Sequence, residues 1–337
     1  MEGMHPLILD ALVKTNMQKT AGYGTDEYCA SAREKILAAC GLTSGEVHFL
    51  VGGTQTNATV IKALLRPYEG VIAASTGHIA LHEAGAIEAS GHKVLTIPAV
   101  DGKLSAVAVD EYIKAFRADE AWDHMVWPGM VYISQPTEYG TLYTLAELEA
   151  LSAVCRKWEI PLFVDGARLG YALASPATDV TLKDLARLCD VFYIGGTKIG
   201  ALFGEALVLV HPEKFDDRFR YMIKRQGALL AKGRLISVQL KALFEGGNES
   251  LYFELSRYEN ELAVKLAKGI EEAGYEFWVP HQTNQLFVIM DNEKIAELEK
   301  DFFFYTWCPY DESRSVIRLV ISWGTTEEDV EALLKVL

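Results

Sequence analysis

Two apolar, strand-like runs of the chain each end in a residue that could do chemistry. Lys198 follows Val191–Ile194 on a turn of small residues, and Asp165 follows Leu162–Val164. A lysine amine forms the Schiff base of pyridoxal 5'-phosphate, and a carboxylate pairs with the protonated pyridine nitrogen of this cofactor. If both residues face one pocket, they predict a pyridoxal-phosphate enzyme that acts on amino acids. Asp165 taken alone could instead cap a helix.

A glycine-rich turn supplies a candidate phosphate site. Gly52, Gly53 and Thr54 come at the end of the strand-like run Val47–Val51 and open a helical pattern. Glycines let the backbone approach a ligand closely, and the amides at a helix N-terminus attract anions. The motif is neither a Walker loop nor a GxGxxG fingerprint. Phosphate binding and a simple helix cap both stay open for this motif alone.

Two histidines follow the strand-like run Val71–Ala74. The flat ring of His78 could stack on a pyridine ring, whereas a structural role is the expectation for His82. The two histidines are four residues apart and would share a helical face, but neither an HExxH motif nor a third ligand cluster accompanies them. We therefore predict no metal site. Glu83 either orients the site or is an ordinary surface carboxylate.

Two arginines are candidate site residues. Arg168 could be a surface residue, but it precedes the apolar run Leu169–Leu173, in a region predicted to be buried, where a charge needs a partner, and this favours a functional role. Arg318 alternates with apolar residues in Val316–Ile321, and its guanidinium matches a carboxylate bidentately. The α-carboxylate of a substrate and a structural salt bridge are the two alternatives for Arg318.

Apolar runs alternate with helical patterns through the first two-thirds of the chain. Continuous apolar strands separated by helices indicate a mostly parallel sheet covered on both faces. We therefore predict an α/β fold with a large cofactor-binding domain over residues 1–245. The strand-like runs lie at residues 47–51, 71–74, 93–97, 130–134, 162–164, 191–194 and 205–210, with helical patterns at 54–65, 78–90, 105–117, 145–158 and 182–188.

The pattern changes towards the end of the chain. Long helical patterns cover residues 236–244 and 251–273, with a glycine-rich break between them. Two strand candidates, at residues 285–290 and 316–321, are flanked by helical patterns at 292–301 and 326–337. These elements predict a small C-terminal α+β domain over residues 246–337.

Composition excludes several classes of function. The chain has 337 residues, half of them hydrophobic, and a net charge of −14, which argues against nucleic-acid binding. No run approaches the roughly 18 apolar residues of a membrane span, and the first residues lack a signal-peptide pattern. Five widely spaced cysteines with no Cys-x-x-Cys motif favour core positions in a cytoplasmic protein.

Taken in chain order, six motifs resemble the threonine aldolase / aromatic-amino-acid β-eliminating lyase family. This family has the PLP-dependent transferase-like fold type I, and within it the chain is most similar to the low-specificity L-threonine aldolases. The resemblance covers nearly the whole chain, and the motifs are specific only together. They are Gly22–Asp26, Gly52–Asn57, Gly77–Ile79, Asp165–Arg168, Thr197–Lys198 and Arg318.

The resemblance implies a role for each matched residue. It also implies a homodimer or homotetramer with shared active sites, so that Tyr23, Asp26 and the basic stretch from Lys224 to Arg234 would serve a neighbouring subunit. Within one subunit, Gly52, Gly53 and Thr54 would hold the phosphate. His78 would stack on the cofactor ring, Asp165 would pair with the pyridine nitrogen, and Lys198 would form the Schiff base. Arg168 would hold the phenolate oxygen or the substrate carboxylate, and Arg318 would bind the substrate carboxylate.

The sequence departs from the family pattern in two places. Glu138 stands where threonine aldolases usually carry a histidine that handles the side-chain hydroxyl of the substrate, and this bears on whether threonine is the physiological substrate. The loop after the lysine, Ile199–Gly204, also differs from the usual glycine loop.

Three hypotheses about function follow. The first is a pyridoxal-phosphate lyase that cleaves a β-hydroxy-α-amino acid to glycine and an aldehyde by retro-aldol cleavage. The second is a β-eliminating lyase on the same scaffold, in which Lys198 removes the Cα proton. The third is a protein that binds the cofactor, or a nucleotide, without this turnover; the missing GxGxxG argues against the nucleotide.

Overall fold

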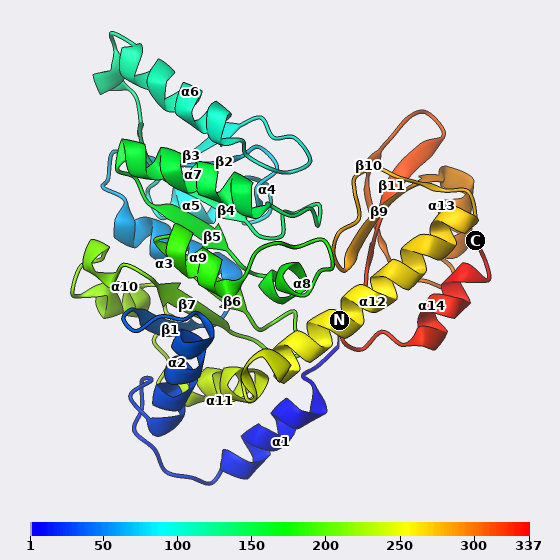
Figure 1. Ribbon diagram of the computed structural model, residues 1–337, viewed down its shortest axis with the longest axis horizontal. Coiled ribbons are helices and arrows are strands. Elements are labelled where there is room, and N and C mark those ends of the chain that lie inside the picture. The colour runs from blue at the N-terminus through cyan, green and yellow to red at the C-terminus, as the bar shows by residue number, and fades with distance from the viewer. Residues whose placement is uncertain (1) are drawn as a thin grey trace.

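The computed structural model describes residues 2–337, which form two β-sheets linked by the long helix α12 (Leu251–Glu272; Figure 1). The larger sheet has seven strands in the order β1-β7-β6-β5-β4-β2-β3. The five strands from β6 to β3 run parallel, and β7 is antiparallel to both of its neighbours. The strands are β1 (Glu46–Leu50), β2 (Glu69–Ala74), β3 (Val94–Ile97), β4 (Trp127–Ser134), β5 (Leu162–Asp165), β6 (Val191–Gly195) and β7 (Glu205–Leu209).

Adjacent residues of the central strands belong to two different hydrophobic cores. One core packs one face of the sheet against helices α6, α7 and α9, and the other packs the opposite face against α3, α5 and α10. Because both faces are covered, the central strands consist mainly of apolar residues, and the sequence predicts all seven strands. In the first core lie Ile72, Val131, Val164 and Phe192; in the second lie Val71, Met130, Phe163 and Tyr193.

Among residues 2–337, eleven α-helices precede α12, and most of them pack around the larger sheet. Five of them follow predicted helical patterns, and four (α1, α2, α8 and α10) were not predicted. Helix α7 begins with a capping box in which Thr144 and Glu147 bond each other's backbone amides. The helices are α1 (Pro6–Thr15), α2 (Glu27–Ala39), α3 (Gly53–Leu64), α4 (His78–Leu81), α5 (Ala86–Ala89), α6 (Ala106–Ala118), α7 (Leu145–Trp158), α8 (Leu169–Leu173), α9 (Leu182–Leu188), α10 (Phe219–Arg225) and α11 (Arg234–Leu243).

The smaller sheet has four antiparallel strands in the order β10-β11-β9-β8. Its strands β9 and β11 pack on α12 through a separate core that includes Leu262, Val288 and Ile317. The elements are β8 (Glu276–Phe277), β9 (Gln285–Asp291), α13 (Asn292–Leu298), β10 (Tyr305–Pro309), β11 (Arg314–Val320) and α14 (Glu327–Leu334). The mostly parallel α/β sheet and this smaller α+β part confirm the predicted fold class, while the domain boundary at residues 245/246 stays a prediction.

Two local predictions are wrong. The helix predicted over residues 78–90 is two short helices, α4 and α5, because Ala84 and Gly85 take left-handed backbone conformations with φ of 51° and 72°. The edge strand β10 was not predicted, since Tyr305–Pro309 is mostly exposed and lacks an apolar pattern. Among residues 2–337 no helix is long and apolar enough to cross a membrane.

Candidate active site

The carboxyl ends of β4, β5 and β6 meet the N-terminus of α3 at two adjoining cavities. The inner cavity has a volume of about 100 Å³ and the outer one about 260 Å³. His78, Glu138, Arg168 and Lys198 line both. Gly53, Thr54 and Asp165 line the inner cavity only, and Arg318 lines the outer one only. The structure thus brings every predicted site residue to one place, with Gly52 directly before Gly53 as the N-cap of α3.

Asp165 is the last residue of β5 and is only 4% exposed. Its Oδ2 accepts hydrogen bonds from the Tyr132 hydroxyl at 2.5 Å and from Asn57 Nδ2 at 3.0 Å. Its Oδ1 accepts from the Tyr193 hydroxyl and from the Ala167 amide. Burial disfavours the charged carboxylate, but the hydrogen bonds from the two tyrosines outweigh it and lower the pKa of Asp165. The residue therefore presents a fixed negative charge to the inner cavity.

A chain of hydrogen bonds ties His78 to this carboxylate. His78 Nδ1 lies 2.8 Å from Glu83 Oε1, which also accepts from Asn57 Nδ2 at 2.7 Å. Burial works against protonation of His78, but the Glu83 hydrogen bond and the nearby Asp165 charge raise its pKa overall. Glu83 is 6% exposed, so the orienting role, rather than that of a surface carboxylate, fits its position.

Lys198 stands on a turn that leaves β6 at Gly195. This turn passes so close to the β5 segment that a Cβ on Gly195 would lie 2.4 Å from the Ala167 carbonyl oxygen, so no larger residue fits there. The Tyr171 hydroxyl donates to the Lys198 carbonyl oxygen and fixes the turn from behind. Burial and the Arg168 charge lower the pKa of the Lys198 amine, which favours the neutral, nucleophilic form.

The N-terminus of α3 opens on the inner cavity. Its N-cap is Gly52, which has no side chain to bond the first amides of the helix. A Cβ on Gly53 would lie 2.8 Å from the Tyr193 hydroxyl, so glycine is needed where the helix approaches the tyrosine that holds Asp165. An uncapped helix N-terminus beside a cavity is a phosphate-binding arrangement.

Arg168 and Arg318 line the outer cavity without a carboxylate to pair with. Neither makes a salt bridge with any of residues 2–337, and Arg318 Nε is buried without a hydrogen-bond partner. The Arg318 guanidinium lies over the rings of Tyr305 and Trp307, at 5.5 and 5.2 Å from their centroids. Burial lowers the pKa of Arg318, and the Arg168 charge adds to this effect. Two facing guanidiniums with open donors suit a bidentate anion. The salt-bridge alternative for Arg318 does not occur in the structure.

Glu138 lies between the two cavities. Its Oε1 accepts hydrogen bonds from the His78 amide at 2.8 Å and from Ser134 Oγ at 2.7 Å. Burial raises the pKa of Glu138 above the ordinary glutamate range. The carboxylate is thus a stronger base than that of an ordinary glutamate, and it can accept a proton and later return it.

The donor set fits pyridoxal 5'-phosphate. A lysine with a lowered pKa, a carboxylate with a lowered pKa that accepts from two tyrosines, an uncapped helix N-terminus and a half-buried imidazole line one cavity. The unpartnered Arg318 Nε adds a site for a carboxylate in the adjoining cavity. Among residues 2–337 no group of three or more His, Cys, Asp and Glu side chains could hold a metal ion.

Sequence reasoning missed the residues that support this site. Tyr132, Tyr193 and Asn57 all bond the Asp165 carboxylate. Tyr132 precedes Ser134 by two residues on β4, so the two share a face of the sheet, and this strand period could have indicated it. Trp307 lies on the strand β10 that was not predicted, and no sequence signal indicated its contact with Arg318.

The stretches expected to serve a neighbouring subunit lie elsewhere in this chain. Asp26 caps α2 by accepting from the Cys29 amide, and the Lys224 amine lies 5.1 Å from the Tyr23 ring centroid. Arg234 donates to the carbonyl oxygens of Thr15 and Asn16. None of these residues lines the two cavities around Lys198.

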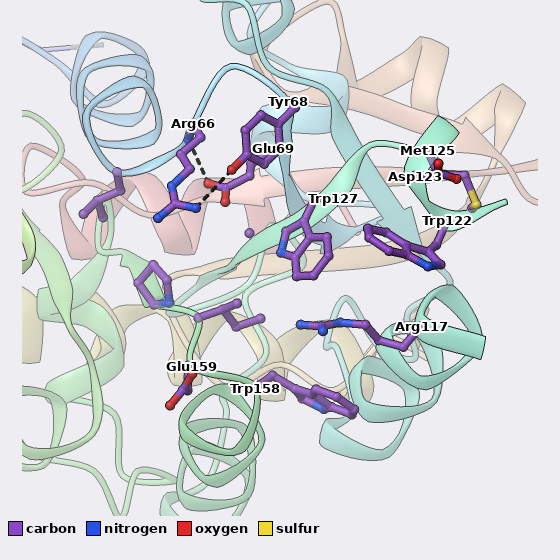
Figure 2. Close-up of a pocket in the computed structure, with 14 residues that line it drawn as sticks. Arg66, Tyr68, Glu69, Arg117, Trp122, Asp123, Met125, Trp127, Trp158 and Glu159 are labelled. Atoms are coloured by element: carbon purple, nitrogen blue, oxygen red, sulfur yellow. Dashed lines mark hydrogen bonds between the residues drawn. The ribbon is translucent and has the colours of Figure 1, made fainter. Parts of the chain in front are cut away.

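A larger cavity lies at the opposite, amino end of the parallel strands (Figure 2). Its volume is about 680 Å³, and none of the predicted site residues lines it. Figure 2 shows the Arg117 side chain between Trp127 and Trp158, with its guanidinium 4.0 Å from the Trp127 ring centroid. Size therefore does not mark the candidate active site in this molecule.

Known proteins resemble this chain over its full length. Residues 6–293 match the family described as β-eliminating lyase. A low specificity L-threonine aldolase of a Pseudomonas species is 31% identical over 336 residues, covering 98% of this chain and 93% of the relative. A solved threonine aldolase of Leishmania major has a TM-score of 0.95 and 45% identity, covering 99% of this chain and 96% of the other. The aspartate aminotransferase of Thermus thermophilus, at 17% identity and a TM-score of 0.70, shares the fold.

Proposed function

The chain belongs to the β-eliminating lyase family, and we propose that it is a pyridoxal-phosphate-dependent lyase that cleaves L-threonine or a similar β-hydroxy-α-amino acid to glycine and an aldehyde. The observation that carries this proposal is the cavity in which Lys198 meets the ionised Asp165, next to two arginines without carboxylate partners. The full-length similarity to threonine aldolases at 31% and 45% identity supports the same reaction.

Three side chains and the N-terminal amides of α3 would hold the cofactor. When bound, pyridoxal phosphate supplies an electron sink for the pair of electrons left by a breaking bond at Cα. Lys198 would offer its amine for covalent attachment, and Asp165 would keep a proton on the pyridine nitrogen. The α3 amides after Gly52 would bind the phosphate. His78, oriented by Glu83, would stack on the cofactor ring.

The outer cavity positions the substrate. Arg318 binds the α-carboxylate with its open donors, and Arg168 adds a second cation beside it. Glu138 accepts the proton of the β-hydroxyl group as the bond between Cα and Cβ breaks, because its raised pKa makes it a stronger base than an ordinary glutamate. Ser134 and the His78 amide keep the accepting carboxylate in place.

We propose a homodimer or homotetramer as the working form. An apolar face of α1 and the segment after it is exposed, with Leu7 at 58%, Val13 at 66% and Met17 at 89% exposure. Monomeric proteins rarely leave such a contiguous apolar face open to water. We also propose a reducing, cytoplasmic location, since all five cysteines are free.

The identity of the products tests the proposed reaction. Purified, cofactor-loaded protein is incubated with L-threonine, L-allo-threonine and L-phenylserine, and glycine, aldehyde, keto acid and ammonia are assayed separately. Glycine and aldehyde in equal amounts are the expected result. A keto acid with ammonia and no glycine would replace the aldolase reaction with β-elimination. No product from any substrate would remove the proposed reaction.

A further inference from the structure

Glu205 is a buried carboxyl group that the mechanism above does not use. It is the first residue of β7, opposite Gly195 of β6, and it is 3% exposed. A buried carboxylate is costly unless it is hydrogen-bonded and faces a cation. Its surroundings therefore indicate what it does.

The Glu205 carboxylate clasps the turn that carries Lys198. Its Oε1 accepts from Thr197 Oγ1 at 2.8 Å, and its Oε2 accepts from the Gly196 amide at 3.2 Å. Thr197 Oγ1 in turn accepts from the Gly204 amide at 2.9 Å. The hydroxyl has one proton to donate and gives it to Glu205. Glu205 is thus the acceptor in both of its hydrogen bonds. Together with the Gly204 amide it holds the start of the loop, at Gly196 and Thr197, against the end of the loop, at Gly204 and Glu205.

The charges around Lys198 are unevenly distributed. Arg168 and Arg318 face Lys198 and disfavour its ammonium form, whereas Glu205 and Asp165 face it and favour that form. Asp165 already accepts four hydrogen bonds, while Glu205 accepts two from neutral donors. The other groups that face Glu205 are the Asp165 carboxylate, whose charge disfavours a second carboxylate nearby, and the hydroxyls of Tyr193 and Tyr252.

We propose that Glu205 is a positioning residue for the reaction and the counter-charge of the Lys198 amine when that amine is not covalently engaged. The inference rests on the proposed function, because in that function the Lys198 amine is attached to the cofactor and released from it in every cycle. In the released state one proton is shared by the pair, as ammonium and carboxylate or as amine and carboxylic acid. Burial raises the pKa of Glu205 and lowers the pKa of Lys198, which brings these two forms close in energy.

The reactivity of Lys198 in the cofactor-free protein tests this pairing. Limiting acetic anhydride acylates only neutral amines, so the labelling of Lys198 is measured by mass spectrometry between pH 6 and pH 10, with the exposed Lys268 as internal reference. The midpoint is the pH at which half of the Lys198 amine is reactive. In Glu205→Gln this midpoint is expected to fall by about one pH unit, since a negative charge near the ammonium group is lost. Glu205→Asp keeps the charge and a midpoint close to that of the wild-type protein. Glu213→Gln, which changes an exposed carboxylate, leaves the midpoint unchanged.

An unchanged midpoint in folded Glu205→Gln protein would overturn the proposal and leave Glu205 as a structural clasp. If that variant does not fold, Lys198→Met tests the same pair from the other side. Glu205 there loses its cation, so the pH at which its protonated-carboxyl band disappears from the infrared spectrum is expected to be higher in the variant than in the wild-type protein. An unchanged pH would overturn the pairing.

The outcome for Glu205 can be separated from the outcome for the proposed function. A shifted midpoint in a protein that makes no glycine from threonine would keep the pairing and remove the reaction. Glycine formation together with an unchanged midpoint would keep the reaction and remove the pairing.

Discussion

The two ends of the parallel sheet differ in a way that cavity size does not reveal. The amino end carries the larger cavity, about 680 Å³, lined by three tryptophans and two arginines. The carboxyl end carries cavities of about 260 and 100 Å³, lined by His78, Glu138, Asp165 and Lys198 among others. In this molecule the candidate active site lies where charged groups are buried, and the volume of a cavity does not indicate where that site is.

The two arginines of the amino end are exposed and contact neighbouring polar and aromatic groups. The Arg66 guanidinium donates to the Tyr68 hydroxyl at 3.0 Å, and its backbone amide donates to Glu69. Arg117 stacks on Trp127. At the carboxyl end, by contrast, burial lowers the pKa values of Arg168 and Arg318, and neither arginine makes a salt bridge with any of residues 2–337. Buried guanidiniums without a carboxylate partner favour the binding of an anionic ligand, whereas exposed arginines are solvated by water.

The largest effect on kcat is expected from removing the Lys198 amine at the carboxyl end of the sheet. Lys198→Ala should lower kcat by about 10⁴-fold or more, on the scale of losing a catalytic nucleophile. Lys157→Ala, which changes an exposed lysine near the amino end that pairs with Asp110, is the matched control and should leave kcat unchanged. Steady-state glycine formation measures both. Substantial turnover by Lys198→Ala would place the chemistry elsewhere.

Asp165→Asn should lower kcat by at least ~100-fold, the scale of losing one preorganised electrostatic partner. An amide cannot stabilise a protonated pyridine nitrogen as a carboxylate does. The variant should still fold and still take up the cofactor, as absorbance spectra and circular dichroism would show. Near-normal turnover would mean that Asp165 only holds Tyr132 and Tyr193 in place.

Glu138→Gln should lower kcat by about 100-fold, the scale of losing a general base. The pH dependence of kcat tests the role of Glu138 more sharply. Because the pKa of Glu138 is raised and the carboxylate form accepts the proton, wild-type kcat should fall as the pH drops through a value above the ordinary glutamate range. That acidic limb should be missing from the pH profile of Glu138→Gln. A variant that keeps the limb would assign the base to another group.

Arg318→Ala should raise KM by about 10- to 100-fold with a smaller change in kcat, as expected for one charged hydrogen-bonding contact. Arg318→Lys keeps the charge without the bidentate geometry and should recover part of the loss. Equilibrium binding of pyridoxal phosphate should be little changed in both variants. Weakened cofactor binding with unchanged KM would move Arg318 from the substrate to the cofactor.

The smallest effect is expected at the amino end. Arg117→Ala removes the contact with Trp127, and the free energy of unfolding should fall by about 0.5–1 kcal/mol, the value of an exposed cation–π pair. Chemical denaturation measures this change. Activity should stay within about twofold of wild type, as for most surface changes. A large loss of activity would show that the two ends of the sheet are coupled.

The sequence predicts the sheet and the reactive residues, because both leave local signals. Buried parallel strands are continuous apolar runs, and Asp165 and Lys198 each follow such a run directly. The supporting contacts leave no such signal. Asn57 bonds an oxygen 108 residues away, and Glu205 looks like the first residue of a strand until the fold places it beside Thr197.

The smaller sheet shows the same limit. Val316–Ile321 has alternating apolar residues and is predicted correctly as a strand, while Tyr305–Pro309 is an exposed edge whose pairing with β11 depends on the fold. The aromatic residues that flank Arg318 come from this edge. Sequence periodicity finds elements that are buried on at least one face, and an edge strand beside a cavity escapes it.

The most direct test of the central claim is where the cofactor is attached. Wild-type protein loaded with pyridoxal phosphate is reduced with borohydride, digested and mapped by mass spectrometry. We expect a single pyridoxyl group on Lys198, at the carboxyl end of the sheet. A label on any other lysine, or no label on a protein that holds the cofactor, would contradict the assignment of the reaction to this cavity.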